Sequence, residues 1–307
     1  MKNSKRTTNK DSIKRWKILS GVLVIAVVTL IGLVALNINN DEAKQVSAQR
    51  GQEVTNENKA ADSTALAEER LIYTSYQNDI NADDAREIEN MLNKWNYLRT
   101  DGKKIAYLTF DDGPSIETTP KILEILKSND IKATFFVLGS NVEKGETQKK
   151  LLKEMVREGH AIGNHGYCHD YSVLYPGRIA DTTAFINDME KSENAMKSVL
   201  GDDFSTKVIR FPGGHMSWKT GELDQVLEQD GYTYIDWNVL NGDAEGNGKT
   251  VEQLIDRLKE TATNLCGNDD VLVVLMHDTD AKPTTAESLQ QSIDYLKSLG
   301  YEFRTLK

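Results

Sequence analysis

The chain has 307 residues, of which 39% are hydrophobic, enough for one sizeable folded domain but hardly for two. Its formal net charge is −10, yet the first 17 residues carry seven Lys or Arg against one Asp, so the remainder is strongly acidic. An acidic body argues against a nucleic-acid-binding protein, because the phosphate backbone requires a basic surface. Two cysteines are too few for a disulfide framework.

A basic segment and an apolar run open the chain. Residues 1–17 hold the basic cluster, and residues 18–36 form an uncharged apolar run of 19 residues. A helix of that length spans the ~30 Å hydrocarbon core of a bilayer. Because basic segments stay cytoplasmic, we predict a cytoplasmic tail over 1–17, a transmembrane helix over 18–38 and an extracellular location for the rest. The alternative, a cleaved signal peptide, also places the rest outside.

Residues 39–102 are predicted to form an extracellular spacer. Its first part, residues 39–81, has few large apolar side chains, a composition typical of a solvated chain. Further along, Ile88, Leu92 and Trp95 occur at the i, i+4, i+7 spacing of an amphipathic helix. We expect this short helix to dock its apolar stripe on the domain that follows.

From residue 103 to 307, β-rich runs alternate with helical periods. The expected strands are 105–110, 133–138, 161–164, 208–211, 232–236, 271–276 and 302–306. The expected helices are 119–128, 148–158, 181–200, 222–230, 251–264 and 286–299. Such alternation implies parallel strands with right-handed crossovers. The predicted fold is α/β, a small or incomplete (β/α) barrel, with a doubly wound open sheet as the alternative.

In a parallel barrel, functional side chains gather where strands end. The first strand is followed by Asp111 and Asp112, two carboxylates that are costly to bury without partners. The third strand is followed by His165 and His169, and imidazoles at i and i+4 can bind one metal ion. With Asp112 they supply three ligands and leave positions open, as in a catalytic zinc site. A plain turn or a loop histidine is the alternative for each motif alone.

Two more strand ends carry polar groups. Arg210 closes the fourth strand and could pair with Asp111, while Gly213 beyond it could let a backbone N–H approach a developing oxyanion. His277 follows the most apolar strand, where it could transfer protons near neutral pH. A surface arginine and a satisfied core histidine are the alternatives. Contributions from four separate strands favour a single site.

These motifs resemble those of the polysaccharide deacetylase family, also known as the NodB homology or carbohydrate esterase family 4 domain. Residues 109–113 read TFDDG, residues 165–169 read HGYCH with both histidines of an HxxxH motif, and residues 275–277 read LMH. The resemblance covers about two thirds of the chain, from residue 103 onwards. It implies a NodB-like barrel that carries a metal-dependent hydrolase.

The resemblance also implies individual roles. Asp111 resembles the catalytic base of the family, and His277 resembles its general acid. Asp112, His165 and His169 resemble the metal ligands. Arg210 belongs to a segment similar to the family's RxPY motif, where it would stabilise the base, and the backbone N–H of Gly213 would contribute to the oxyanion hole.

Three positions depart from the family pattern. Gly166 follows the first histidine, where serine or threonine is usual. Gly213 replaces the tyrosine of the third motif, so any role of that ring is lost. In the fourth motif Asp243 fits the aspartate that orients the acid histidine, while Ala244 stands where tryptophan is common. These departures bear on substrate fit more than on chemistry.

The resemblance implies a membrane-anchored deacetylase that removes N-acetyl groups from a cell-wall polysaccharide and releases acetate. The expected ion is Zn²⁺, with Co²⁺ or Ni²⁺ as substitutes. The expected partners are a peptidoglycan strand, acetylated on GlcNAc or MurNAc, and the membrane, with no nucleic acid. Chitin-like or O-acetylated polymers, a catalytically silent wall-binding protein and a hydrolase of small amides are the alternatives. The oligomeric state is left open.

Overall fold

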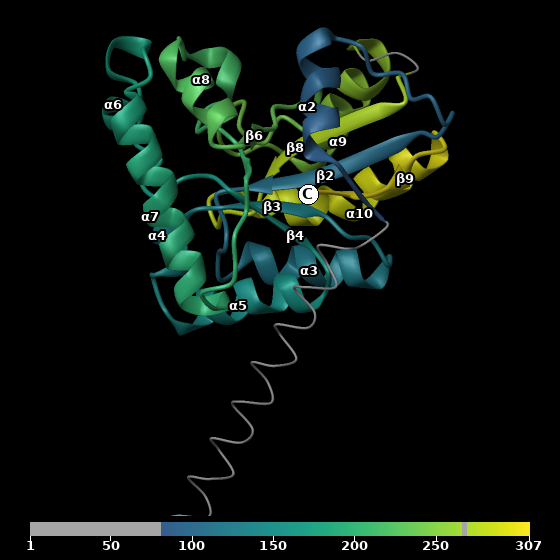
Figure 1. The fold of residues 1–307 in the computed structure, drawn as a ribbon. Helices are drawn as coiled ribbons and strands as arrows, with labels where there is room; N and C mark the ends of the chain where they lie inside the picture. The colour runs from purple at the N-terminus through teal and green to yellow at the C-terminus, as the bar shows by residue number, and fades with distance from the viewer. Residues whose placement is uncertain (1–80, 266–268) are drawn as a thin grey trace, which may run out of the picture. The chain divides into compact units, whose positions relative to one another are not determined.

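A parallel sheet of eight strands forms the centre of the structure, a computed structural model that describes residues 81–265 and 269–307 (Figure 1). The strand order is β6-β5-β4-β3-β2-β8-β7, and β9 pairs with β2. These strands are β2 (Ile105–Asp111), β3 (Thr134–Val137), β4 (Ala161–Asn164), β5 (Val208–Ile209), β6 (Thr233–Tyr234), β7 (Val239–Leu240), β8 (Val271–His277) and β9 (Glu302–Phe303). A separate two-stranded sheet pairs β1 (Ala82–Asp83) with β10 (Thr305–Leu306).

Helices connect most of the successive strands, and α3 and α5 lie on one side of the sheet with α2 on the other (Figure 1). The longer helices are α2 (Ala85–Lys94), α3 (Thr118–Ser128), α5 (Glu146–Arg157), α7 (Thr182–Leu200), α8 (Glu222–Gln229), α9 (Val251–Lys259) and α10 (Pro283–Ser298). The shorter ones are α4 (Gly139–Val142), α6 (Tyr171–Leu174), η1 (Pro176–Arg178), η2 (His215–Ser217) and η3 (Glu260–Leu265). The strands and helices predicted from residue 103 onwards are present with ends shifted by a few residues, except that the strand predicted over 302–306 is divided into β9 and β10, which belong to different sheets.

The sheet curves into a half-barrel that stays open. Strands β6 and β7 stand at the two ends of the strand order, and no strand pairing joins them within the described residues. All the pairings of the sheet are parallel. The prediction of an incomplete barrel of parallel strands is therefore confirmed, and the doubly wound alternative is set aside.

Side chains alternate between two cores along the central strands. In β2, Leu108 and Phe110 belong to the large core beneath the outer helices, whereas Ile105 and Tyr107 belong to a second core on the inner face. Strand β8 alternates in the same way. Successive side chains of a strand point to opposite faces, so both faces of β2 and β8 are buried and the strands read as continuous apolar runs.

Helix α2 fills the inner face, as the apolar stripe near residue 88 predicts. Ile88 and Leu92 are buried there, and the Asp84 side chain caps the first turn. Trp95, which the stripe also predicts to be buried, is 71% exposed. The helix ends at Lys94, and Trp95 has a left-handed conformation with φ 52°, which takes it out of the helical period.

Strand β1 ties the last part of the predicted spacer to the barrel. Asp83 accepts hydrogen bonds from the hydroxyl of Tyr107, from Arg99 at 3.1 Å and from Arg304 at 2.8 Å. Because Tyr107 lies in β2 and Arg304 precedes β10, this carboxylate joins three segments of the chain. Residues 81–102 therefore pack with the unit that holds residues 103–307.

None of the helices in the described part of the chain is long and apolar enough to cross a membrane. The predicted tail over 1–17, the predicted transmembrane helix over 18–38 and the first part of the spacer lie outside the described residues.

Replacing Ile88 with alanine is expected to lower the free energy of unfolding by about 2–5 kcal/mol, because it leaves a cavity in the inner core. Trp95→Ala should change it by less than about 0.5 kcal/mol, because most of that ring already lies in water. Urea denaturation followed by circular dichroism measures both. Equal losses would mean that Trp95 belongs to the buried stripe after all.

Candidate active site

A cavity of about 350 Å³ opens at the carboxyl ends of the strands. Six of the eight residues predicted for the site line it: Asp111, Asp112, His165, His169, Gly213 and His277. The other two, Arg210 and Asp243, are buried and hydrogen-bonded to Asp111 and His277. The residues predicted from the strand ends therefore come together at one place in the fold.

Strand register brings the predicted base and acid together. In the β2–β8 ladder Asp111 stands opposite His277. Both continue the series of inward-facing positions, which in β2 contains Tyr107 and in β8 contains Val273. Neighbouring residues in a parallel ladder point to the same face, so the two side chains share the inner side of the barrel. The inward-facing row of side chains therefore ends in Asp111 on β2 and in His277 on β8.

Asp112, His165 and His169 form the one potential metal-binding cluster found among the described residues. Oδ1 of Asp112 lies 3.5 Å from Nε2 of His165 and 3.6 Å from Nε2 of His169. Ligand atoms ~2.1 Å from a tetrahedral zinc ion stand ~3.4 Å apart. Oδ1 of Asp112 is also buried with no hydrogen-bond partner in the described part of the chain. The three residues therefore fit a divalent cation.

The tautomer of His165 is fixed by the backbone. Its Nδ1 lies 2.9 Å from the carbonyl oxygen of Arg210, an acceptor, so the proton is assigned to Nδ1 and Nε2 keeps its lone pair. Burial lowers the pKa of His165, although the nearby carboxylates oppose this shift. The ring is therefore neutral and presents Nε2 to the cation site.

An uncommon backbone conformation orients two of the three candidate metal ligands. Asp112 and His169 both have positive φ, 72° and 50°, a conformation that is uncommon for residues other than glycine and concentrated at functional sites. After Asp112, a Cβ at Gly113 would lie 2.1 Å from Oδ2 of the buried Asp278. Only glycine fits there, which explains the residue that follows the two aspartates.

Glycine is also required between the two histidines. A Cβ at Gly166, where φ is 81°, would lie 2.5 Å from Oδ2 of Asp188. That carboxylate accepts hydrogen bonds from the backbone N–H groups of Tyr167 and Cys168, at 2.7 and 3.1 Å. The departure at position 166 therefore makes room for the carboxylate that holds the His169 loop.

Arg210 is completely buried and pairs with Asp111, as predicted. Its Nη1 lies 2.8 Å from Oδ1 of Asp111 and 2.7 Å from Oγ1 of Thr109. Its Nε donates to the carbonyl oxygen of Ile235 at 2.7 Å, and the guanidinium stacks on Phe136 at 4.2 Å. The pair holds one oxygen of Asp111 in place and leaves the other on the cation side, 3.8 Å from His165 Nε2.

His277 and Asp243 make the contact that the fourth motif predicts. Nδ1 of His277 lies 2.8 Å from Oδ1 of Asp243, whose other oxygen accepts from the His277 N–H and from Thr285. Burial alone would lower the pKa of His277, but the hydrogen bond and charge of Asp243 and other nearby carboxylates raise it to about 9. The ring is thereby kept protonated at neutral pH.

Several lining residues were missed by the sequence argument, among them Tyr171 and Trp237. Tyr171 begins α6, two residues after His169, and Trp237 lies in the segment that follows β6. Their position in loops after strand ends was visible in the sequence. Nothing in the spacing showed that these two loops approach the same cavity.

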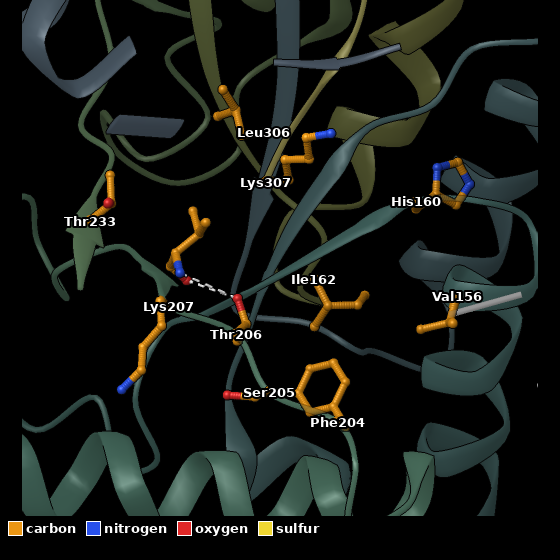
Figure 2. Close-up of a pocket in the computed structure, with 11 residues that line it drawn as sticks. Val156, His160, Ile162, Phe204, Ser205, Thr206, Lys207, Thr233, Leu306 and Lys307 are labelled. Atoms are coloured by element: carbon orange, nitrogen blue, oxygen red, sulfur yellow. Dashed lines mark hydrogen bonds between the residues drawn. The ribbon is translucent and has the colours of Figure 1, made fainter. Parts of the chain in front are cut away.

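A second cavity, of about 330 Å³, lies at the other end of the barrel (Figure 2). Its lining comes from residues that precede or begin β4, β5 and β6, including His160, Ile162 and Thr233, and from Leu306 and Lys307. His160 is buried, and its Nδ1 accepts a hydrogen bond from the N–H of Ala133 at 3.1 Å. None of the predicted site residues lines this cavity, so the assignment of the active site stays with the strand ends.

The chain is similar in sequence to known polysaccharide deacetylases. The family model for polysaccharide deacetylase matches residues 98–235. A putative polysaccharide deacetylase of Bacillus subtilis, YheN, is 33% identical over 207 residues, which cover 67% of this chain and 68% of that protein. A peptidoglycan-N-acetylglucosamine deacetylase of Bacillus cereus is 32% identical over 215 residues, covering 69% and 73%.

Among solved structures, a Streptococcus mutans CE4 esterase superimposes with a TM-score of 0.67 at 38% identity. The match covers 74% of this chain and 92% of that one. Sequence relatives and structural neighbours thus agree with the family that the motifs resemble and with the half-barrel fold. The chain belongs to the polysaccharide deacetylase family.

Proposed function

We propose that the protein removes the acetyl group from N-acetylglucosamine in peptidoglycan and releases acetate. The observation that carries this proposal is the convergence of two acid–base groups and a three-residue cation site in one cavity at the strand ends. The relatives named as peptidoglycan deacetylases support the choice of polymer. N-acetylmuramic acid in the same polymer is the neighbouring candidate.

Asp112, His165 and His169 would hold the cation, for which we propose Zn²⁺. Imidazole and carboxylate donors suit zinc, and Co²⁺ or Ni²⁺ could replace it. Bound there, the ion would supply Lewis-acid polarisation of a carbonyl and activation of water. The neutral tautomer of His165 is the form that such binding requires.

The other site residues would transfer protons and stabilise the negative charge that develops on the carbonyl oxygen. Asp111, held by Arg210, would accept a proton from the water that attacks the acetamide carbonyl carbon. The N–H of Gly213 would donate a hydrogen bond to the carbonyl oxygen as it gains negative charge. When the C–N bond breaks, His277 would give its proton to the departing nitrogen, which leaves as the amine of glucosamine.

The proposed reaction is tested on purified peptidoglycan. Wild-type protein loaded with zinc should convert acetylated muropeptides to forms that lack one acetyl group, as seen by mass spectrometry after muramidase digestion. His165→Ala should lose both the metal, measured by elemental analysis, and the activity. Full metal occupancy in His165→Ala would contradict the ligand assignment, and unchanged muropeptides with the wild-type protein would contradict the substrate.

Asp243→Asn tests the proposed acid. His277 is active while protonated, so activity falls as the pH rises through its pKa, which Asp243 raises. Removing that charge should move the alkaline limb of kcat/KM to lower pH by roughly 1–3 units, with little change in the acid limb. A bound cation acts on both proteins alike, so the difference persists. An unchanged alkaline limb would show that Asp243 does not raise the pKa of the catalytic acid.

We further propose that the catalytic unit works outside the cell, anchored by a transmembrane helix over 18–38 with residues 1–17 in the cytoplasm. The basic cluster before the apolar run supports this orientation. Protease added to intact cells stripped of their wall should digest the catalytic unit, whereas a cytosolic marker protein should survive. Survival of residues 100–307 under the same conditions would refute the orientation.

A further inference from the structure

The space beside Gly213 is filled by two aromatic side chains from other parts of the chain. A Cβ built at Gly213, where φ is 80°, would lie 3.0 Å from the hydroxyl oxygen of Tyr171 and 3.1 Å from Cζ2 of Trp218. Such contacts are tighter than ordinary van der Waals packing. Where the family has a tyrosine side chain at this position, the protein instead places the hydroxyl of Tyr171 next to the Gly213 backbone.

Aromatic contacts support Tyr171, which is 44% exposed. It is the first residue of α6, and its ring lies 5.2 Å from the ring of His169 and 5.0 Å from that of Trp218. Trp218 in turn stacks on Tyr175 at 4.1 Å and donates from Nε1 to the carbonyl oxygen of Pro212 at 2.9 Å. The aromatic group thereby connects the loop after His169 to the turn that contains Gly213.

The Tyr171 hydroxyl and the Gly213 backbone therefore lie side by side at the catalytic cavity. Both Tyr171 and Gly213 line that cavity, together with Asp111 and His277. Neither the Tyr171 hydroxyl nor the Gly213 N–H has a hydrogen-bond partner within residues 81–265 and 269–307. A polar side chain that faces a reaction cavity with its donor unused is available to a substrate.

We propose that Tyr171 is a catalytic residue whose hydroxyl donates a hydrogen bond to the carbonyl oxygen of the scissile acetyl group, beside the N–H of Gly213. The inference rests on the proposed hydrolysis of an acetyl group. The proton stays on the tyrosine oxygen throughout, and no bond to the substrate forms. Paired donors aimed at a developing oxyanion stabilise the transition state more than the ground state, so the contribution belongs to kcat.

The test compares Tyr171→Phe with the wild-type protein at equal zinc content. The variant keeps the ring and loses the hydroxyl, so kcat should fall about 100-fold, as when one oxyanion donor is removed, with little change in KM. Two substrates are used: an oligomer of N-acetylglucosamine and an aryl acetate ester. Turnover of the ester alone would contradict the proposed polymer. It would still test Tyr171, because both reactions pass through a tetrahedral oxyanion on the acetyl carbon.

Tyr175→Phe is the matched control. Tyr175 belongs to the same aromatic group, but its hydroxyl is buried without a partner among the described residues and does not line the cavity. Its loss should leave kcat unchanged. Acetate, the shared product, provides a readout without turnover: calorimetry should show several-fold weaker binding to Tyr171→Phe. Wild-type kcat and acetate affinity in Tyr171→Phe, or equal losses in both variants, would overturn the proposal.

Discussion

The arrangement of the strand ends inside the half-barrel depends on one buried charged side chain, the guanidinium of Arg210. A charge removed from water costs several kcal/mol unless its donors are paired. Here they reach Asp111, Thr109 and the backbone of Ile235, so strands β2, β5 and the end of β6 are held together. The carbonyl oxygen of Arg210 meanwhile fixes the ring of His165. The position of Asp111 and the tautomer of His165 therefore depend on one residue.

The alternation of side chains along a strand explains why the sequence predicted so much of the site. Every second residue of β2 and β8 faces inward, and the last inward positions are Asp111 and His277. Because parallel strands end at the same edge, polar residues just beyond apolar runs converge whatever their distance along the chain. Asp112, His165 and His169 were found by the same reasoning, which needs only strand ends and residue types.

Other features depend on contacts that no local pattern encodes. Trp95 continues the apolar period of α2, but the helix stops one residue earlier and the ring faces solvent. Strands β1 and β7 have two residues each and were not predicted. Strands β5 and β6 are equally short, but each lies in a longer β-rich run, 208–211 and 232–236, that predicted it. The replacement of a side chain at Gly213 by Tyr171 joins two loops after different strands, and only their packing brings these loops together.

The two borders of the cavity differ in how firmly strand pairing holds them. Seven register pairs join β2 to β8, so the spacing between Asp111 and His277 is fixed by the most continuous ladder of the sheet. The segment between β6 and β7, which carries Trp237, instead borders the cavity where no strand pairing closes the barrel in the described residues. Substitutions along that border can reshape the rim without disturbing a strand ladder. Such a scaffold can adapt to new polymers during evolution while its hydrolytic chemistry is conserved.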